Sequence, residues 1–233
     1  MPQNPPIAIG HLPPAAVWRI GQTHGYDGLT VQDAMLLVGL YTSRDATIVD
    51  FDADPALALA ARARARCYRP VRTSEEVGQL GPTMGASQLV HLAWPRPSGT
   101  AADVAALFEA VAALLADDGI LVVCLAPGAG GPDNAEHVRL RQAVGGAGLV
   151  CFQRIVIAAA ATDGVDRFTY HLDAGELDAL LSRRAESGRL RADLLICSRR
   201  QPPAHEVAGT GGHGRTARRS GAAASDAAGG GAR

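Results

Sequence analysis

Three aspartates at alternate positions, Asp50, Asp52 and Asp54, follow an apolar run in the stretch IVDFDADPAL. Carboxylates placed in this way can act as nucleophile and acid in phosphoryl transfer, line a cofactor loop, or end a strand and cap a helix. Asp54 followed by Pro55 is typical of a helix N-terminus. Asp50 can accept hydrogen bonds from backbone N–H groups at the strand end, so only Asp52 is left without an evident local role.

Composition removes several function classes. All 22 basic residues of the 233-residue chain are arginine, whereas phosphate-loop NTPases and Schiff-base enzymes need a lysine. The formal net charge of -1 provides no global attraction to nucleic acid or to an anionic membrane. A nucleic-acid partner is therefore not supported by charge, and no membrane partner is expected.

The four cysteines lie far apart, each in or beside a short apolar run, at Cys67, Cys124, Cys151 and Cys197. This spacing fits neither a zinc cluster nor a disulfide framework, so four buried thiols and no metal site are expected. No apolar stretch reaches the roughly 20 residues that span a bilayer, and the N-terminus does not resemble a signal peptide. These features predict a cytoplasmic protein with reduced thiols.

Composition also divides the chain into three regions. Residues 1–29 begin with a proline-rich stretch and are assigned to an N-terminal arm, and residues 30–200 carry the helix and strand patterns. Residues 201–233 form a Gly/Ala/Arg-rich tail whose only large apolar residue is Val207. Because this tail can bury too little apolar surface to offset the entropy of ordering it, we predict that it is disordered.

Strand and helix patterns alternate between the arm and the tail. Thr30 and Asp33 resemble a capping box that opens the first helix. The predicted strands are 46–51, 67–71, 88–94, 120–127, 149–160 and 191–200, and the main predicted helices are 31–41, 55–66, 101–119, 133–148 and 174–187. This alternation predicts the α/β class, with a doubly wound, parallel sheet and helices on both faces.

The stretch DFDAD resembles the phosphotransfer motif of the haloacid dehalogenase superfamily, in which Asp-x-Asp follows a buried strand. That family also uses a downstream lysine or arginine and a serine or threonine at a later strand end. Here Asp54-Pro55 stands where the family has Thr or Val followed by an apolar residue, and the later run ILVVCLAP has no serine or threonine. The residues therefore depart from that motif at several places.

A wider resemblance covers residues 30–200. The segments LYTSRDATIVDFDADPALALAA, QLVHLAWPRP and VAALLADDGILVVCLAP are similar, in this order, to the motifs of class I S-adenosylmethionine-dependent methyltransferases. The resemblance implies a Rossmann-like sheet with strand order 3-2-1-4-5-7-6, a short or missing third strand, and an antiparallel last strand in a mostly parallel sheet. The part before Asp50 is most similar to DNA amino-methyltransferases.

The same resemblance implies where S-adenosylmethionine would bind. Asp50, Phe51, Asp52 and Ala53 correspond to the cofactor loop, although the family's glycines are missing. Glycines let a backbone approach a ligand closely, and the added carboxylates would repel the carboxylate of the cofactor. The family's ribose-binding acid is also absent, since Arg69 and Arg72 stand near the end of the second strand.

On the acceptor side, the resemblance implies that Trp94 and Pro95 line the site. The chain has Ala93-Trp94-Pro95-Arg96-Pro97 where amino-methyltransferases have Asp, Asn or Ser before Pro-Pro and an aromatic residue. Trp94 could stack on a flat substrate or shield the core as a strand-end residue, and no catalytic residue is assigned. Two functions follow: a divergent methyltransferase with a small-molecule or nucleobase acceptor, or a non-catalytic module that has lost the cofactor loop.

Overall fold

The structure of the chain is a computed structural model that describes residues 15–20, 29–71, 76, 79–81, 84–96, 100–126, 135–159, 170–172 and 190–199. The predicted tail, the helix predicted over 174–187 and the first 14 residues of the predicted arm lie outside these residues. The domain boundaries at residues 30 and 200 therefore stay predictions.

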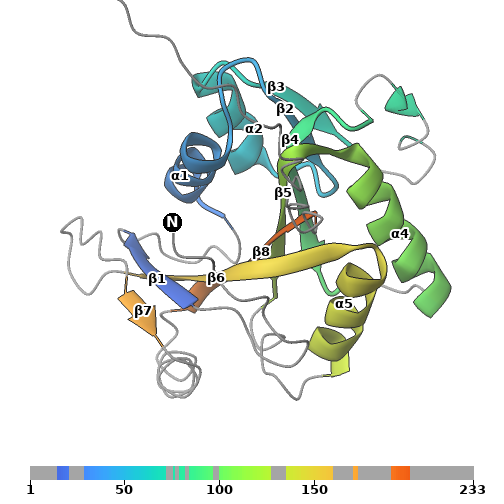
Figure 1. Cartoon of the computed structure of the whole chain (residues 1–233). Helices are drawn as coiled ribbons and strands as arrows, with labels where there is room; N and C mark the ends of the chain where they lie inside the picture. Colours follow the sequence, from blue (N-terminus) through green and yellow to red (C-terminus); the bar gives the residue numbers. More distant parts are fainter. Residues whose placement is uncertain are drawn as a thin grey trace, which may run out of the picture. The chain divides into compact units, whose positions relative to one another are not determined.

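Eight strands of the described residues form one sheet with the order β3-β2-β4-β5-β8-β6-β1-β7 (Figure 1). Neighbouring strands are parallel from β3 to β5 and between β6 and β1, and β8 and β7 are antiparallel to their neighbours. The strands are β1 (Ala15–Ile20), β2 (Thr47–Asp50), β3 (Cys67–Pro70), β4 (Ser87–Trp94), β5 (Leu115–Leu125), β6 (Leu149–Ala159), β7 (Tyr170–Leu172) and β8 (Leu190–Arg199).

The predicted fold class is confirmed. Taken in spatial order, β3, β2, β4, β5, β8 and β6 reproduce the expected order 3-2-1-4-5-7-6 without its third strand. The last predicted strand, β8, lies antiparallel between β5 and β6. Among the described residues no strand lies beyond β3, so the sheet ends there on that side.

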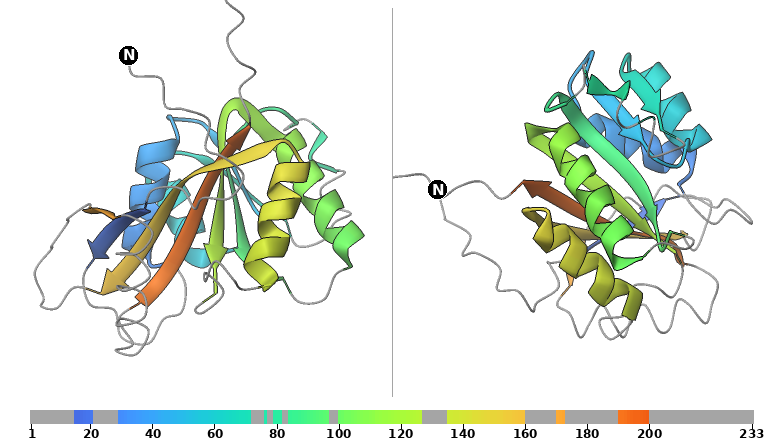
Figure 2. Two further views of the ribbon diagram at one scale, coloured as in Figure 1. Left: turned by 60° about the horizontal axis from the view of Figure 1, so that its bottom comes forward. Right: turned by 90° about the vertical axis from the view of Figure 1, so that its right-hand side faces the viewer.

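Helices cover both faces of the sheet (Figure 2). On one face, α1 (Val31–Tyr41) and α2 (Pro55–Ala63) pack against β2, β4 and β5 in one apolar cluster. On the other, α4 (Ala101–Leu114) and α5 (Ala135–Gly146) form a second cluster with the same strands. No helix of the described residues is long and apolar enough to cross a membrane.

Local sequence signals set where the first two helices begin. The Thr30 hydroxyl accepts a hydrogen bond from Asp33 N at 3.2 Å, and the Asp33 carboxylate accepts one from Thr30 N at 2.9 Å. Asp54 Oδ1 accepts from Ala56 N and Leu57 N at 2.7 and 3.2 Å, which caps α2 just before Pro55. Both predicted caps are therefore confirmed.

Two strands were not predicted. β1, AAVWRI, lies inside the region assigned to the N-terminal arm and pairs in parallel with β6, and β7 pairs with β1. β1 lies between β6 and β7 and β7 lies at the edge, and short strands such as these are held by main-chain hydrogen bonds to their neighbours, which need no long apolar run. β1 follows a proline-rich stretch, so composition assigns it to the arm with that stretch, and β7 has only three residues.

The helix predicted over 101–119 ends five residues earlier, at Leu114, and β5 begins at the next residue. Gly119 permits this early start, because a Cβ there would lie 2.5 Å from the carbonyl oxygen of Ser87. The close approach accompanies a register shift between β4 and β5 at Ser87 and Leu89. The final part of the predicted helix is thus the first part of a strand.

The cysteine prediction is wrong in two respects. Cys151 and Cys197, which face each other on the antiparallel strands β6 and β8, form a disulfide. Cys67 is exposed, and Cys124 is half-buried. Sequence spacing could not indicate this pairing, because the strand register alone brings together two residues that are 46 positions apart. Disulfides are rare in reducing compartments, so this disulfide does not fit the predicted reduced thiols. The cytoplasmic location itself stays a prediction.

Candidate functional site

The carboxyl ends of β2, β3 and β4 bring together residues from distant parts of the sequence. The strand register places Asp50 of β2 opposite Pro70 of β3 and His91 of β4. Tyr68 of β3 also reaches Asp50, with its hydroxyl donating to Asp50 Oδ2 at 2.6 Å. In open α/β sheets this edge is where ligands bind, so the cluster around Asp50 is the candidate site.

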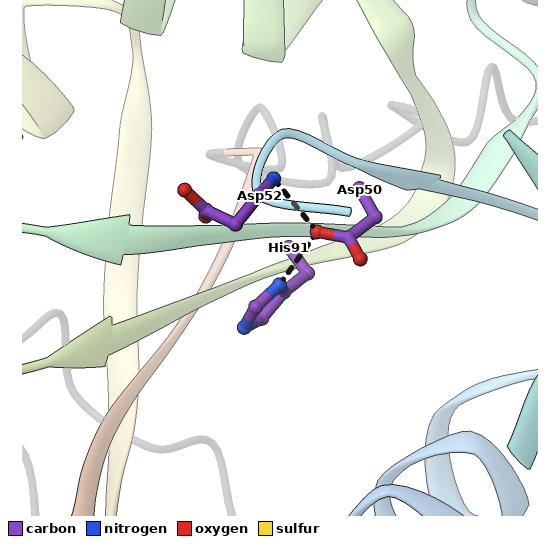
Figure 3. Close-up of side chains that lie close together, drawn as sticks. All are labelled: Asp50, Asp52 and His91. Atoms are coloured by element: carbon purple, nitrogen blue, oxygen red, sulfur yellow. Dashed lines mark hydrogen bonds and ion pairs between the residues drawn. The ribbon is translucent and has the colours of Figure 1, made fainter. Parts of the chain in front are cut away.

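Asp50 is buried and fully hydrogen-bonded. Its Oδ1 accepts from Asp52 N at 3.0 Å and lies 2.9 Å from His91 Nδ1 (Figure 3). Its Oδ2 accepts from Asp54 N at 2.7 Å and from Tyr68. Four partners match the acceptor capacity of one ionised carboxylate. Asp50 therefore anchors the loop after β2 to both neighbouring strands.

The interaction between Asp50 and His91 favours the charged form of each residue. Burial by itself would raise the pKa of Asp50, but the hydrogen bonds from His91, Tyr68 and the Asp52 amide lower it below the ordinary value. Burial would also lower the pKa of His91, but its interactions with Asp50 and Cys124 raise it to about 10. Both shifts favour the charged forms of the two residues, whereas Nε2 of His91 is buried without a hydrogen-bond partner among the described residues.

The loop after β2 keeps a sharply turned shape. Phe51 N donates to His91 O at 3.0 Å, and the Phe51 side chain is buried among the residues below α4 and α5. Ala53 has φ of 53°, in the left-handed region where a Cβ is unfavourable and glycine is preferred. The chain thus adopts at Ala53 a conformation suited to glycine without having one.

The side chain of Asp52 leaves the loop and contacts both the last residues of β4 and the segment that follows it. One carboxylate oxygen accepts a hydrogen bond from Ala93 N, and the other lies 3.2 Å from Arg96 Nη1. Arg96 Nη2 donates to Phe51 O at 3.1 Å. Asp52, which had no evident role in the sequence, therefore ties two loops together across the carboxyl edge.

Asp50, Asp52 and His91 each present a metal-ligand atom, and these atoms lie within 4.8 Å of one another. The sequence predicts no metal site. A divalent ion here would need His91 neutral, since a protonated imidazole is not a ligand. In the structure His91 Nδ1 contacts Asp50 Oδ1 at 2.9 Å, and the absence of metal stays a prediction.

The proposed acceptor residues differ in their exposure. Trp94 is buried, its Nε1 donates to Glu136 O at 3.0 Å, and its ring centroid lies 6.0 Å from that of Phe108. Its ring is therefore part of the core, the second of the two roles considered for it, and offers no face for stacking on a substrate. Pro95, joined to Trp94 by a cis peptide bond, is exposed, and its role stays a prediction.

No family model matches the chain, and no curated protein matches it. Among solved structures, it is similar to geranyl diphosphate methyltransferase in complex with GPP and sinefungin, at 13% identity and a TM-score of 0.46, covering 78% of this chain and 88% of that one.

Two further similar structures are methyltransferases. Geranyl diphosphate C-methyltransferase from Streptomyces coelicolor A3(2) is 12% identical, with a TM-score of 0.42 and coverage of 72% of this chain and 80% of that one. A SAM-dependent methyltransferase from Leishmania major is 8% identical, with a TM-score of 0.41 and coverage of 72% and 71%. Structural similarity at these TM-scores carries no argument about the fold. The fold assignment therefore rests on the observed strand order.

Sequence reasoning missed three residues of the site: Tyr68, His91 and Arg96. His91 interrupts the apolar run of β4, and a titratable residue inside such a strand was the available signal. Tyr68 precedes the end of β3 by two residues, where Arg69 is exposed and Arg72 lies outside the described residues. Arg96 carried no signal of its own, because only the fold brings it to Asp52.

Proposed function

We propose that the chain is a divergent S-adenosylmethionine-dependent methyltransferase-like protein whose cofactor lies at the carboxyl ends of β2, β3 and β4. One observation carries this proposal: the buried carboxylate of Asp50 accepts the backbone N–H groups of Asp52 and Asp54 and so shapes a turned loop at that edge. Ligands of open α/β sheets bind outside the carboxyl ends of the strands, and this loop lies at that edge.

The loop after β2 fits the cofactor in its backbone conformation, whereas the Asp52 carboxylate and the absence of the family's ribose-binding acid at the end of β3 do not fit it. The backbone at Ala53 already has the left-handed conformation that close approach to a ligand uses. The buried residues Asp50 and Phe51 hold the loop in which Ala53 lies. The Asp52 carboxylate opposes the fit, because it would repel the carboxylate of the cofactor's methionine group. When bound, the cofactor would supply a methyl group, and the chain would contribute by positioning donor and acceptor.

The acceptor stays open between a small molecule and a nucleobase. Ala93 has no polar side chain to hold a target amine, and Trp94 is buried. Descent from DNA amino-methyltransferases and a cytoplasmic location therefore remain predictions from the sequence.

A second candidate is a non-catalytic module with a methyltransferase-like sheet. The contact of Asp52 with Arg96 favours it, because this pair spans the loop where the methionine group would lie. Such a module would keep the sheet and bind a different ligand or partner.

Thermal unfolding with S-adenosylhomocysteine separates the two candidates. A ligand that binds only the folded protein at 100 times its dissociation constant adds about 2.7 kcal/mol to the free energy of unfolding, so the midpoint should rise. Ala53→Leu should remove this rise. Ala65→Leu is the matched control, since Ala65 has the same φ of 53° at the end of α2, and it should keep the rise. An unchanged midpoint in the parent chain would favour the non-catalytic module.

A further inference from the structure

We propose that Arg96 and the backbone N–H of Ala93 form a binding site for a carboxylate, and that Asp52 is the ligand that this site holds within the chain. The proposal rests on the proposed function only for the identity of the external ligand, the methionine carboxylate of S-adenosylmethionine. The site itself follows from the contacts of described residues.

The donors converge on one carboxylate from one short segment. Asp52 Oδ1 lies 3.2 Å from Arg96 Nη1, and Asp52 Oδ2 accepts from Ala93 N. A second contact fixes the Arg96 side chain, because its Nη2 donates to Phe51 O at 3.1 Å. A guanidinium and a backbone amide that each bind one oxygen of the same carboxylate are a specific arrangement for recognising that group.

The end of β2 explains why the Ala93 amide is available. On this edge of β4 the last main-chain hydrogen bond runs from Phe51 N to His91 O, after which the loop turns away. Main-chain N–H groups of residues two apart on a strand point to the same neighbouring strand, so the next donor on that edge is Ala93 N. The Asp52 side chain takes the place that a continuing β2 would have filled.

Asp52 is exchangeable in this position. The side chains of Asp52 and Arg96 are 28% and 31% exposed, and ion pairs that remain in contact with water are weak. Asp50 shapes the loop and Asp54 caps α2, so neither function requires the Asp52 carboxylate. An external carboxylate can therefore replace it, and in the parent chain the two compete.

Replacing Asp52 exposes the site to a simple probe. In Asp52→Gly, acetate should cause saturable shifts in the NMR signals of the Ala93 amide and the Arg96 side chain. Asp52→Asn keeps an oxygen for Ala93 N but loses the charge toward Arg96, so it should respond more weakly. The double variant Asp52→Gly, Arg96→Gln should show no saturable shift, and circular dichroism would confirm that each variant is folded.

A second measurement connects the site to the cofactor. Asp52→Gly should bind S-adenosylhomocysteine about fivefold more tightly than the parent, which corresponds to about 1 kcal/mol. It should bind 5′-methylthioadenosine, which has no carboxylate, with unchanged affinity. Adding Arg96→Gln should reverse the gain for S-adenosylhomocysteine alone.

The outcomes keep the two proposals apart. Saturable acetate binding that needs Arg96 supports the carboxylate site even if S-adenosylhomocysteine does not bind, in which case only the proposed function fails. A folded Asp52→Gly whose signals do not respond to acetate overturns the carboxylate site. An equal gain for both nucleosides would also overturn it, because the gain would then come from space in the loop.

Discussion

His91 Nδ1 lies 2.9 Å from Asp50 Oδ1, and both side chains are almost completely buried where the end of β2 pairs with β4. The pair joins two strands beneath the loop that would hold the cofactor. Because each charge is buried, each depends on the other, and removing one partner leaves the other uncompensated. The site and the stability of the fold are therefore coupled.

This coupling predicts a pH dependence of stability. The pKa of His91 rises from 6.5 in the unfolded chain to about 10 in the fold, so its contribution is complete below pH 6.5 and is lost as the pH rises through about 10. The pKa of Asp50 is lowered from 3.8, so its contribution is present above pH 3.8 and is lost as the pH falls through the folded value.

The measurement is urea unfolding at pH values from 5 to 10.5. The free energy of unfolding of the parent should decline between pH 6.5 and 10 relative to His91→Gln, which has no titrating group at this position. At pH 7, His91→Ala should lower it by about 3 kcal/mol. Parallel pH profiles for the parent and His91→Gln would show that the pair is not charged.

Ala53 and Ala65 provide a matched pair for backbone strain. Both have φ of 53°, and a left-handed conformation costs a residue with a Cβ about 1 kcal/mol. Ala53→Gly and Ala65→Gly should each raise the free energy of unfolding by about that amount, measured by denaturant titration. Only Ala53→Gly should alter the affinity for S-adenosylhomocysteine. Equal effects of both variants on binding would place the cofactor away from Ala53.

Asp54 should matter for stability and not for binding. Its carboxylate caps α2 through Ala56 N and Leu57 N, and loss of such a cap costs about 1 kcal/mol. Asp54→Ala should lower the free energy of unfolding by this amount while calorimetry shows unchanged ligand affinity. A large loss of affinity would indicate that Asp54 itself contacts the ligand.

The disulfide predicts a clear response to reduction. Its partners are 46 positions apart, and on a loop-entropy model closing a loop of this length stabilises the fold by about 4 kcal/mol. A reducing agent, or Cys151→Ser with Cys197→Ser, should lower the free energy of unfolding accordingly. Thiol titration of the native parent should react first at Cys67, which is exposed. Four free thiols after non-reducing purification would contradict the pairing.

Much of the fold was predictable from local signals. The Thr30 and Asp33 capping box, the Asp54-Pro55 start of α2 and the apolar runs of β4 and β5 each specify an element through neighbouring residues alone. The alternation of these elements then predicts the doubly wound sheet. Elements with short patterns, such as β1, depend on a neighbouring strand and could not be found in this way.

The site was only partly predictable, because its key contacts join residues that are far apart in sequence. Asp50 was placed correctly at a strand end, but its partners Tyr68 and His91 lie 18 and 41 positions away. Asp52 meets Arg96 only because β2 and β4 are adjacent in the sheet. A sequence pattern indicates the residues that end each strand and not which strands become neighbours.

Isothermal titration calorimetry with S-adenosylhomocysteine tests the central claim most directly. The account predicts saturable heat with one ligand per chain for the parent, because the loop shaped by Asp50 is intact even though Asp52 lies across it. His91→Ala, which removes the support below that loop, should weaken or abolish this heat. Absence of binding to the folded parent at millimolar ligand would contradict the claim that this edge of the sheet is a cofactor site.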